Sequence, residues 1–334
     1  MRFHAIGFGA LNLDEFWEVS EGFLASLGLE SGREYVRDED WFREIYPQLM
    51  AQGRRRALDP GGSAANMIAA LRRMGFSTGF YGVTGSEDLH LLRTEELGEG
   101  EGLRIRATHR PAGRCLSLLH GTGRGRDRTL VIFPNANDLA ALHVPETDYF
   151  LAALWVHMTS FASPVVLDAQ AILACGLREP TRLSFDPGAV YCRLGLERLR
   201  PVIERTAILF LSVEEMQILT GQPDPEGAAE ALHGLGVGTI VVKLGADGLI
   251  GFSEGQKVYQ PAVTPASVRD RTGAGDVAAA GFLAGVLSSL TLGECLALAA
   301  LCASKSLEGY GRATYPDAAS LEELKARARR VVRP

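Results

Sequence analysis

The sequence predicts an α/β domain built on a largely parallel β-sheet with helices packed on its faces. Apolar strand-like segments alternate with amphipathic helix-like segments through most of the chain, and glycine-, proline- or aspartate-containing turns separate them. The chain has 334 residues, 46% of them hydrophobic, so it is long enough to bury a large core. We therefore expect one large domain, alone or with a smaller appendage.

The first part of the chain shows this alternation clearly. Residues 3–8 are expected to form a strand, residues 63–74 a helix and residues 78–83 a second strand. The helix would begin at an N-cap, Ser63, because a serine hydroxyl accepts hydrogen bonds from the first amides. It would end before Gly75, because glycine favours the turn that terminates a helix.

The second half of the chain repeats the pattern. Strands are expected at residues 153–158, 182–185, 207–211, 239–243, 248–253 and 256–259, the last two as a hairpin. Helices are expected at residues 164–175, 195–204, 213–220, 226–234, 276–289, 293–307 and 319–331. This order favours parallel pairing, because each helix returns the chain to the same end of the sheet.

Two stretches break the alternation. Residues 15–60 have mixed polarity and are partly helical around 38–52, and residues 103–133 are expected to form two strands around a turn from His120 to Arg128. Long insertions in compact domains are more often functional than idle, so we interpret the two stretches together as a small β-rich lid. Surface loops with no common role are the alternative. The main domain would comprise residues 1–14, 61–102 and 134–334.

Charge and cysteine content argue against several classes of function. A net charge of −6 gives no broad electrostatic reason to bind nucleic acid or an anionic membrane, and the basic clusters Arg54–Arg56 and Arg124, Arg126 and Arg128 are expected to be solvated. Five cysteines without a C-x-x-C pair argue against a disulfide framework and a zinc site. Without a signal-peptide pattern or an apolar run long enough to span a bilayer, we expect a cytoplasmic protein.

The strongest functional signal is the segment DRTGAGD, residues 270–276, directly before a predicted apolar helix. Its small residues Gly273, Ala274 and Gly275 let backbone N–H groups converge on the point that the positive end of the helix faces. Such an anion hole suits the charge that develops on a transferring phosphoryl group. Asp276 follows directly and can accept the proton of an attacking hydroxyl. A segment that only caps the helix is the alternative.

Two further segments place polar groups near the start of the chain. Gly61 and Gly62 precede the first predicted helix and let a ligand touch the backbone, while Asn66 can both donate to and accept from hydroxyls. Asn12 and Asp14 follow the first strand, at the end of the sheet where ligands bind, and Asp14 can accept hydrogen bonds from two hydroxyls. An ordinary start of a helix and a turn-capping aspartate are the alternatives.

These three segments, in this order, resemble the PfkB, or ribokinase-like, family of carbohydrate kinases over nearly the whole chain. Further similar segments are GVTGSED at residues 82–88, VKLGADG at 242–248 and the terminal helix and loop at 304–316. The resemblance implies a three-layer fold in which helices flank a mostly parallel central sheet, with a small β-rich lid. It also implies Mg²⁺-ATP as phosphoryl donor and allows a monovalent cation such as K⁺ near Asp270 and Thr272.

The resemblance also implies a role for each candidate residue. Asp276 would be the base, beside the anion hole formed by residues 273–275. The residues expected to hold the acceptor are Asn12, Asp14, Gly61, Gly62 and Asn66. The residues expected beside the nucleotide are Lys243, Gly245, Gly248, Arg271 and Thr272.

The sequence departs from the family pattern at two of these places. The family's N-x-x-E segment, which organises magnesium and phosphate, is present as Ser212 to Glu215, so that Glu215 would act on the metal through water. Arg271 replaces a small or hydroxyl residue, and we expect it to contact the donor phosphates because the guanidinium group matches their geometry. A solvated or ion-paired arginine is the alternative.

We expect transfer of the γ-phosphoryl group of ATP to a hydroxyl of a sugar. An adenosine or other nucleoside is the alternative acceptor, because Ser63 and the long segment before Gly61 are similar to those of the family's nucleoside kinases. The resemblance also allows a homodimer formed through the lid. Two other classes stay open: a dehydrogenase, because Gly7-Phe8-Gly9 follows a strand, and a non-catalytic ligand sensor that retains the fold.

Overall fold

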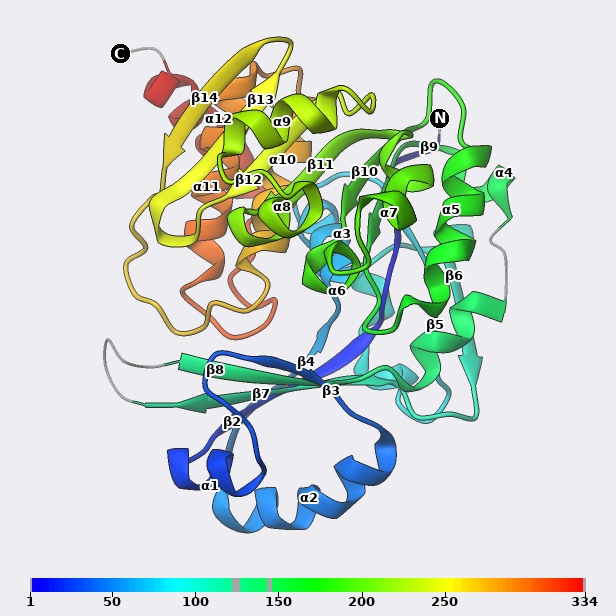
Figure 1. Ribbon diagram of the computed structural model, residues 1–334, viewed down its shortest axis with the longest axis vertical. Coiled ribbons are helices and arrows are strands. Elements are labelled where there is room, and N and C mark those ends of the chain that lie inside the picture. The colour runs from blue at the N-terminus through cyan, green and yellow to red at the C-terminus, as the bar shows by residue number, and fades with distance from the viewer. Residues whose placement is uncertain (1, 122–126, 143–145, 333–334) are drawn as a thin grey trace.

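The computed structural model of the protein describes residues 2–121, 127–142 and 146–332. Two β-sheets organise the chain, a large one in the main domain and a small one in the lid (Figure 1). The main sheet has nine strands in the order β14-β13-β12-β11-β10-β9-β1-β5-β6, and only β13 and β14 pair antiparallel to their neighbours. Its strands are β1 (Phe3–Phe8), β5 (Thr78–Gly85), β6 (Leu103–Thr108), β9 (Ala153–Thr159), β10 (Arg182–Asp186), β11 (Thr206–Ser212), β12 (Thr239–Lys243), β13 (Gly248–Ser253) and β14 (Gln256–Pro261).

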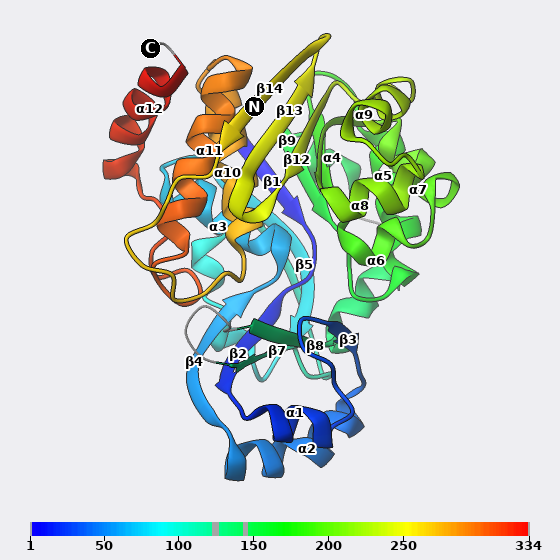
Figure 2. The same cartoon turned by 60° about the vertical axis from the view of Figure 1, so that its left-hand side comes forward.

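Helices cover both faces of the main sheet, as the two views show (Figures 1 and 2). One face carries α3 (Ser63–Arg73), α10 (Ala274–Leu287), α11 (Leu292–Ser306) and α12 (Ala318–Val332). The other carries α4 (Thr147–Phe150), α5 (Leu167–Gly176), α6 (Gly188–Cys192), α7 (Leu196–Ile203), α8 (Val213–Thr220) and α9 (Pro225–His233). Each face has its own buried apolar core, so the sheet forms the middle of three layers and the predicted fold class is confirmed.

Short 3-10 helices connect several of these elements. They are Leu89–Leu91, Thr94–Glu96, Gly100–Gly102, Asn135–Leu142, Pro164–Val166 and Gly245–Asp247. In the described part of the chain, no helix combines the length and apolar character needed to cross a membrane.

The lid is a five-stranded sheet with two helices on its outer face (Figure 2). Its strands, in sheet order, are β3 (Glu34–Val36), β8 (Asp127–Phe133), β7 (Gly113–His120), β2 (Asn12–Glu18) and β4 (Arg54–Gly61). The helices α1 (Glu21–Ser26) and α2 (Glu39–Gln52) bury Phe23, Phe42 and Ile45 against Trp17, Leu116 and Phe133 of the sheet. The opposite face of the lid sheet therefore faces the main domain.

The structure corrects the predicted boundaries of the lid. Residues 103–108 form β6, which pairs in parallel with β5 at the edge of the main sheet, so the lid does not begin at residue 103. The segment alternates apolar and charged residues as a lid strand would, and a half-exposed edge strand has the same pattern. At the other boundary β2 begins at Asn12, so Asn12 and Asp14 belong to the lid sheet. Residues 122–126 of the predicted arginine-rich turn, with Arg124 and Arg126, lie outside the described residues.

The predicted N-cap of α3 was also wrong. The helix begins after Gly62, whose φ of +99° is accessible to glycine, and no side chain caps the first amides. A β-carbon at Gly62 would lie 2.1 Å from the carbonyl oxygen of Ala10, so the close approach of two backbones determines the start of this helix. The predicted end is confirmed, because Gly75 has a φ of +93° directly after the last turn.

Candidate active site

The first turn of α10 holds Asp276 at the edge of a group of backbone amides. Gly273 precedes the helix in the left-handed region, with a φ of +75°. Among the described residues, the N–H groups of Gly273, Gly275 and Asp276 have no backbone acceptor, as expected for the start of a helix. The rest of α10 is buried from Val277 to Gly285, which fixes this end of the helix in place. The predicted juxtaposition of a carboxylate and an amide pocket is therefore present.

Asn66 is the direct partner of Asp276. Its Nδ2 donates to Asp276 Oδ2 over 3.0 Å, which joins α3 to the start of α10. Burial raises the pKa of Asp276 to about 7, and the hydrogen bond from Asn66 partly offsets this effect. The charge of Asp186 raises the pKa further, while Lys243 lowers it. A carboxyl with this pKa is suited to take a proton near neutral pH.

Lys243 forms an ion pair between the ends of β12 and β10, which lie on either side of β11. Its Nζ lies 2.5 Å from Asp186 Oδ2, and the other oxygen of Asp186 accepts from the N–H of Gly188. Burial lowers the pKa of Lys243, but Asp186, Glu215 and Asp276 outweigh it, so the pKa is raised and the ammonium stays charged. We predicted Lys243 beside the nucleotide, and the structure places its side chain against Gly275 of the amide pocket.

Asp14 lies beside Gly61 and Gly62, the two glycines before α3. A β-carbon at Gly61 would lie 2.1 Å from Asp14 Oδ2, so only glycine leaves room for this carboxylate. Burial raises the pKa of Asp14 to about 7; Arg312 lowers it, while Asp270 and Asp276 raise it. Its Oδ1 is buried and has no partner among the described residues. A buried acceptor without a donor is suited to a ligand hydroxyl.

A small cavity of about 100 Å³ lies between the lid and the main domain. Asn12 is held at its wall, because its Oδ1 accepts from Asn137 Nδ2 over 2.9 Å while Asn137 Oδ1 accepts from the N–H of Leu11. Two of the lining residues, Asn12 and Gly62, were predicted for the acceptor site. The cavity is lined by Ala10, Asn12, Glu34, Gly62, Ser63, Ile132, Pro134, Asn137, Ser160, Phe161, Ala162 and Val190.

The loop before α10 contacts the lid. Thr272 Oγ1 donates to Asp270 Oδ1 over 2.9 Å and accepts from Arg128 Nη1 over 3.0 Å. Arg128 lies on β8 of the lid, so this contact closes the lid over the loop. The predicted solvated face therefore does not describe Arg128. Asp270 is buried, burial raises its pKa, and its Oδ2 has no partner among the described residues.

Three residues predicted beside the nucleotide are not tied to this cluster. Arg271 is exposed, and its side chain forms no hydrogen bond or ion pair with the described residues. Gly245 is exposed, with open space where a side chain would lie. Gly248 is buried, and a β-carbon there would lie 2.1 Å from the carbonyl oxygen of Gln260, so the hairpin requires this glycine. Their contacts with a nucleotide stay predictions.

Glu215 is engaged within its own helix. Its Oε2 accepts from the N–H of Ser212 over 2.6 Å, and Ser212 Oγ accepts from the N–H of Glu215 over 3.2 Å. This capping box explains why a serine is compatible with the start of α8. In the described part of the chain, no three His, Cys, Asp or Glu side chains gather into a metal site.

Fold and site together define an enzyme that transfers a phosphoryl group to an alcohol. A carboxylate beside an amide pocket and under a lid has the groups that such a transfer needs, a candidate base, a candidate anion hole and a cover over both. The chain belongs to the pfkB family of carbohydrate kinases, whose model matches residues 23–318. Members of this family transfer a phosphoryl group to a hydroxyl of a sugar or nucleoside, and the protein is accordingly a phosphotransferase of this kind.

Individual proteins are similar to this chain over most of its length. An uncharacterized sugar kinase of Archaeoglobus fulgidus is 30% identical over 242 residues, 72% of this chain and 95% of that protein. The structure of adenosine kinase from Sinorhizobium meliloti matches with a TM-score of 0.80 and 22% identity, covering 99% of this chain and 100% of that one. Arabidopsis thaliana ribokinase complexed with ribose and ATP matches with a TM-score of 0.73 and 22% identity, covering 97% and 99%.

Proposed function

We propose that the protein transfers the γ-phosphoryl group of ATP to a hydroxyl of a sugar. The observation that carries this proposal is the position of Asp276, a carboxyl with a pKa near 7 at the mouth of the amide pocket of α10. The relatives support the choice of substrates, since one is named a sugar kinase and another was solved with ribose and ATP.

The reaction would begin with the acceptor hydroxyl between Asp14 and Asp276. The unpartnered Oδ1 of Asp14 is available to accept from one hydroxyl, and Asn12 offers a second polar contact in the cavity. Asp276 takes the proton of the attacking hydroxyl while the oxygen of that hydroxyl forms a bond to the γ-phosphorus. The bond from that phosphorus to the bridging oxygen breaks, and ADP leaves with the electron pair.

The part of the site that would face the phosphates consists of backbone amides and two positively charged side chains, Lys243 and Arg271. The free amides of Gly273 and Gly275 would receive the transferring group, because their N–H dipoles favour the negative charge that develops there. Lys243 contributes a fixed positive charge beside Gly275. The exposed Arg271 is available to reach donor phosphates, and the ATP KM of Arg271→Ala tests this; an unchanged KM and kcat would contradict it.

The cation requirements also follow from the residues present. Mg²⁺ would offset charge on the donor phosphates, and a metal held mainly by phosphate and water needs few protein ligands. Glu215 has one oxygen committed to its capping box, so the other would act on the metal through water. The buried, unpartnered Oδ2 of Asp270 fits a monovalent cation such as K⁺ beside Thr272.

The variant Asp276→Asn tests the base. We expect kcat to fall by orders of magnitude, because an amide cannot take a proton, while ATP binding measured by calorimetry persists. Near-normal turnover in this variant would refute the assignment. The exposed carboxylate Asp148 in α4, changed to Asn, is the matched control and should leave kcat unchanged.

A nucleoside is the second candidate acceptor, favoured by the apolar side chains of Ile132, Phe161 and Val190 in the cavity. An assay of ADP release with a panel of sugars, polyols and nucleosides separates the two candidates. Binding without turnover for every member of the panel would instead indicate a ligand sensor. NAD(H) binding followed by fluorescence would revive the dehydrogenase alternative.

The proposal extends to the cellular compartment and the oligomeric state of the protein. All five cysteines are free thiols, four of them buried, which agrees with a reducing compartment such as the cytoplasm. A homodimer through the lid stays a prediction. The helices α1 and α2 cover the outer face of the lid sheet, so pairing with a second copy through the sheet itself would use an edge strand such as β4, which carries Arg54–Arg56. Light scattering on the purified protein measures its oligomeric state.

A further inference from the structure

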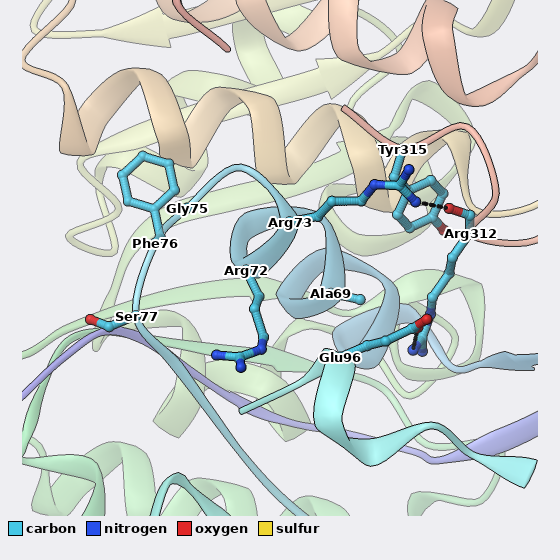
Figure 3. A pocket seen from close by; sticks show the side chains of 9 residues that line it. All are labelled: Ala69, Arg72, Arg73, Gly75, Phe76, Ser77, Glu96, Arg312 and Tyr315. Atoms are coloured by element: carbon cyan, nitrogen blue, oxygen red, sulfur yellow. Dashed lines mark hydrogen bonds and ion pairs between the residues drawn. The ribbon is translucent and has the colours of Figure 1, made fainter. Parts of the chain in front are cut away.

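A buried arginine, Arg312, lies behind the base in the loop between α11 and α12. Its side chain is 3% exposed, and its Nε donates to Asn66 Oδ1 over 3.2 Å. Its Nη1 lies 3.1 Å from Glu96 Oε2, and its carbonyl oxygen accepts from Arg73 Nη1 over 2.9 Å. Arg312, Glu96 and Arg73 line a cavity of about 570 Å³ (Figure 3).

The position of Arg312 determines which way the amide of Asn66 points. An asparagine amide has a donor side and an acceptor side of nearly equal size, and it can rotate to exchange them. A guanidinium group only donates and a carboxylate only accepts. Placed between Arg312 and Asp276, the amide of Asn66 must turn Oδ1 to the arginine and Nδ2 to the carboxylate, as observed.

We propose that Arg312 is a positioning residue for the reaction: it locks the amide of Asn66 so that a hydrogen-bond donor always faces the base Asp276. The role as part of a reaction rests on the proposed function, whereas the lock itself is a property of the folded chain. Without Arg312 the amide is free to rotate, and a carbonyl oxygen facing the carboxylate would repel its charged form.

Arg312 is itself connected to the lid. Glu96, its partner, lies 3.6 Å from Arg93 Nη1, and Arg93 Nη2 lies 2.6 Å from Asp59 Oδ1 on the lid strand β4. Gly311, next to Arg312, has a φ of +53°, and a β-carbon there would lie 2.5 Å from Asp59 Oδ2. These contacts join the loop that carries Arg312 to the lid strand β4, so the lock and the lid are physically connected.

The charged and titratable groups that face Asp276 come from several elements. They are Asp14 on β2, Asp186 on β10, Lys243 on β12 and Tyr315 on the α11–α12 loop. Arg312 acts on this group twice, through the amide of Asn66 on Asp276 and through its charge on Asp14. Its removal should therefore raise the pKa of both carboxyls, since it takes a donor from one and a positive charge from the other.

The experiment compares Arg312→Ala with the wild-type protein and with Arg73→Ala. Arg73 lines the same cavity and donates to the carbonyl oxygen of Arg312 but not to Asn66, so its removal should change neither readout. The first readout is the ¹³C NMR titration of aspartate carboxyls, with the Asp276 signal assigned by its loss in Asp276→Asn. We expect its pKa to rise by about one unit in Arg312→Ala, the size of effect that one hydrogen bond to a carboxylate produces.

The second readout is kcat/KM against pH. In Arg312→Ala its acid limb should move to higher pH by the same amount and kcat should fall, while the KM for ATP stays within about twofold because no phosphate contact is lost. Ethylguanidinium, which can enter the cavity left beside residue 312, should restore part of kcat in Arg312→Ala and none in Arg73→Ala.

The outcomes separate the two proposals. An unshifted carboxyl titration in Arg312→Ala overturns the lock, whatever the activity. A shifted titration in a protein that phosphorylates no acceptor supports the lock and counts against the proposed function. If Arg312→Ala does not fold, Arg312→Lys is the second variant. It keeps a buried positive charge but lacks the planar guanidinium group that contacts Asn66 and Glu96 at the same time. It should raise the pKa of Asp276 and leave the pKa of Asp14 nearly unchanged.

Discussion

Lys243 Nζ lies 2.5 Å from Asp186 Oδ2, and this ion pair joins the ends of β12 and β10 beside the first turn of α10. The pair is mostly buried, with side-chain exposures of 20% for the lysine and 10% for the aspartate. Asp276 responds to both charges in opposite directions, so the pair balances the field at the base. A lysine predicted to lie beside the nucleotide therefore also lowers the pKa of the neighbouring carboxyl of Asp276.

Lys243→Met should show how far the charge of Lys243 lowers the pKa of Asp276. The variant leaves the charge of Asp186 uncompensated, so the pKa of Asp276 should rise and the acid limb of kcat/KM should move to higher pH. Breaking a buried pair also costs roughly 3 kcal/mol in the free energy of unfolding, measured with urea. The control Lys257→Met removes an exposed partner of Glu226 and should change neither quantity. An unmoved acid limb would show that Lys243 acts on the nucleotide alone.

The stability of the protein should depend on the ionisation of Asp276. Its pKa is about 7 in the folded chain against an ordinary value of 3.8, so the folded state holds a proton that the unfolded state releases. The contribution of Asp276 to the free energy of unfolding should therefore be largest below about pH 4, fall as the pH rises to about 7, and stay level above it. Asp276→Asn, which cannot ionise, should have a higher Tm than the wild type at pH 8.

The same comparison at lower pH provides the control. The difference in Tm between Asp276→Asn and the wild type should shrink as the pH falls from about 7 and disappear only well below pH 3.8, where the carboxyl is protonated in both states. Calorimetric scans across this range measure it. A difference in Tm that does not vary with pH would mean that the substitution acts through packing and not through charge.

Most of the features that were predicted correctly depend on local patterns in the sequence. Helix and strand periodicity and the small residues of the 270–276 loop depend on neighbours along the chain, so α8, β12 and the amide pocket were found from the sequence. The missed features join distant positions: Arg128 with Thr272 is 144 residues apart, and Arg312 with Asn66 is 246. Nothing local marks either arginine as a partner, because the lid strand β8 brings Arg128 to Thr272 and the loop between α11 and α12 brings Arg312 to Asn66.

Glycine at position 62 should be irreplaceable for two separate reasons. Alanine there would have to adopt a φ of +99° and would place a methyl group 2.1 Å from the carbonyl oxygen of Ala10. The control Gly255→Ala also has a positive φ, +75°, but meets nothing within 4 Å, so it should cost only about 1 kcal/mol. Urea unfolding should show a clearly larger loss for Gly62→Ala, and equal losses would mean that the backbone at Ala10 moves aside freely.

Arg128→Gln should loosen the lid without touching the base. Arg128 Nη1 donates to Thr272 Oγ1 over 3.0 Å, and this contact ties β8 of the lid to the loop that carries the amide pocket. A shorter, uncharged side chain should let the lid open more often, so water would reach the site in place of the acceptor. We expect the acceptor KM to rise several-fold and the ratio of ATP hydrolysis to acceptor phosphorylation to increase. The control Arg33→Gln removes an exposed lid arginine paired with Glu30 and should leave this ratio at the wild-type value. A wild-type ratio in Arg128→Gln as well would contradict the role of the Arg128–Thr272 contact in closing the lid.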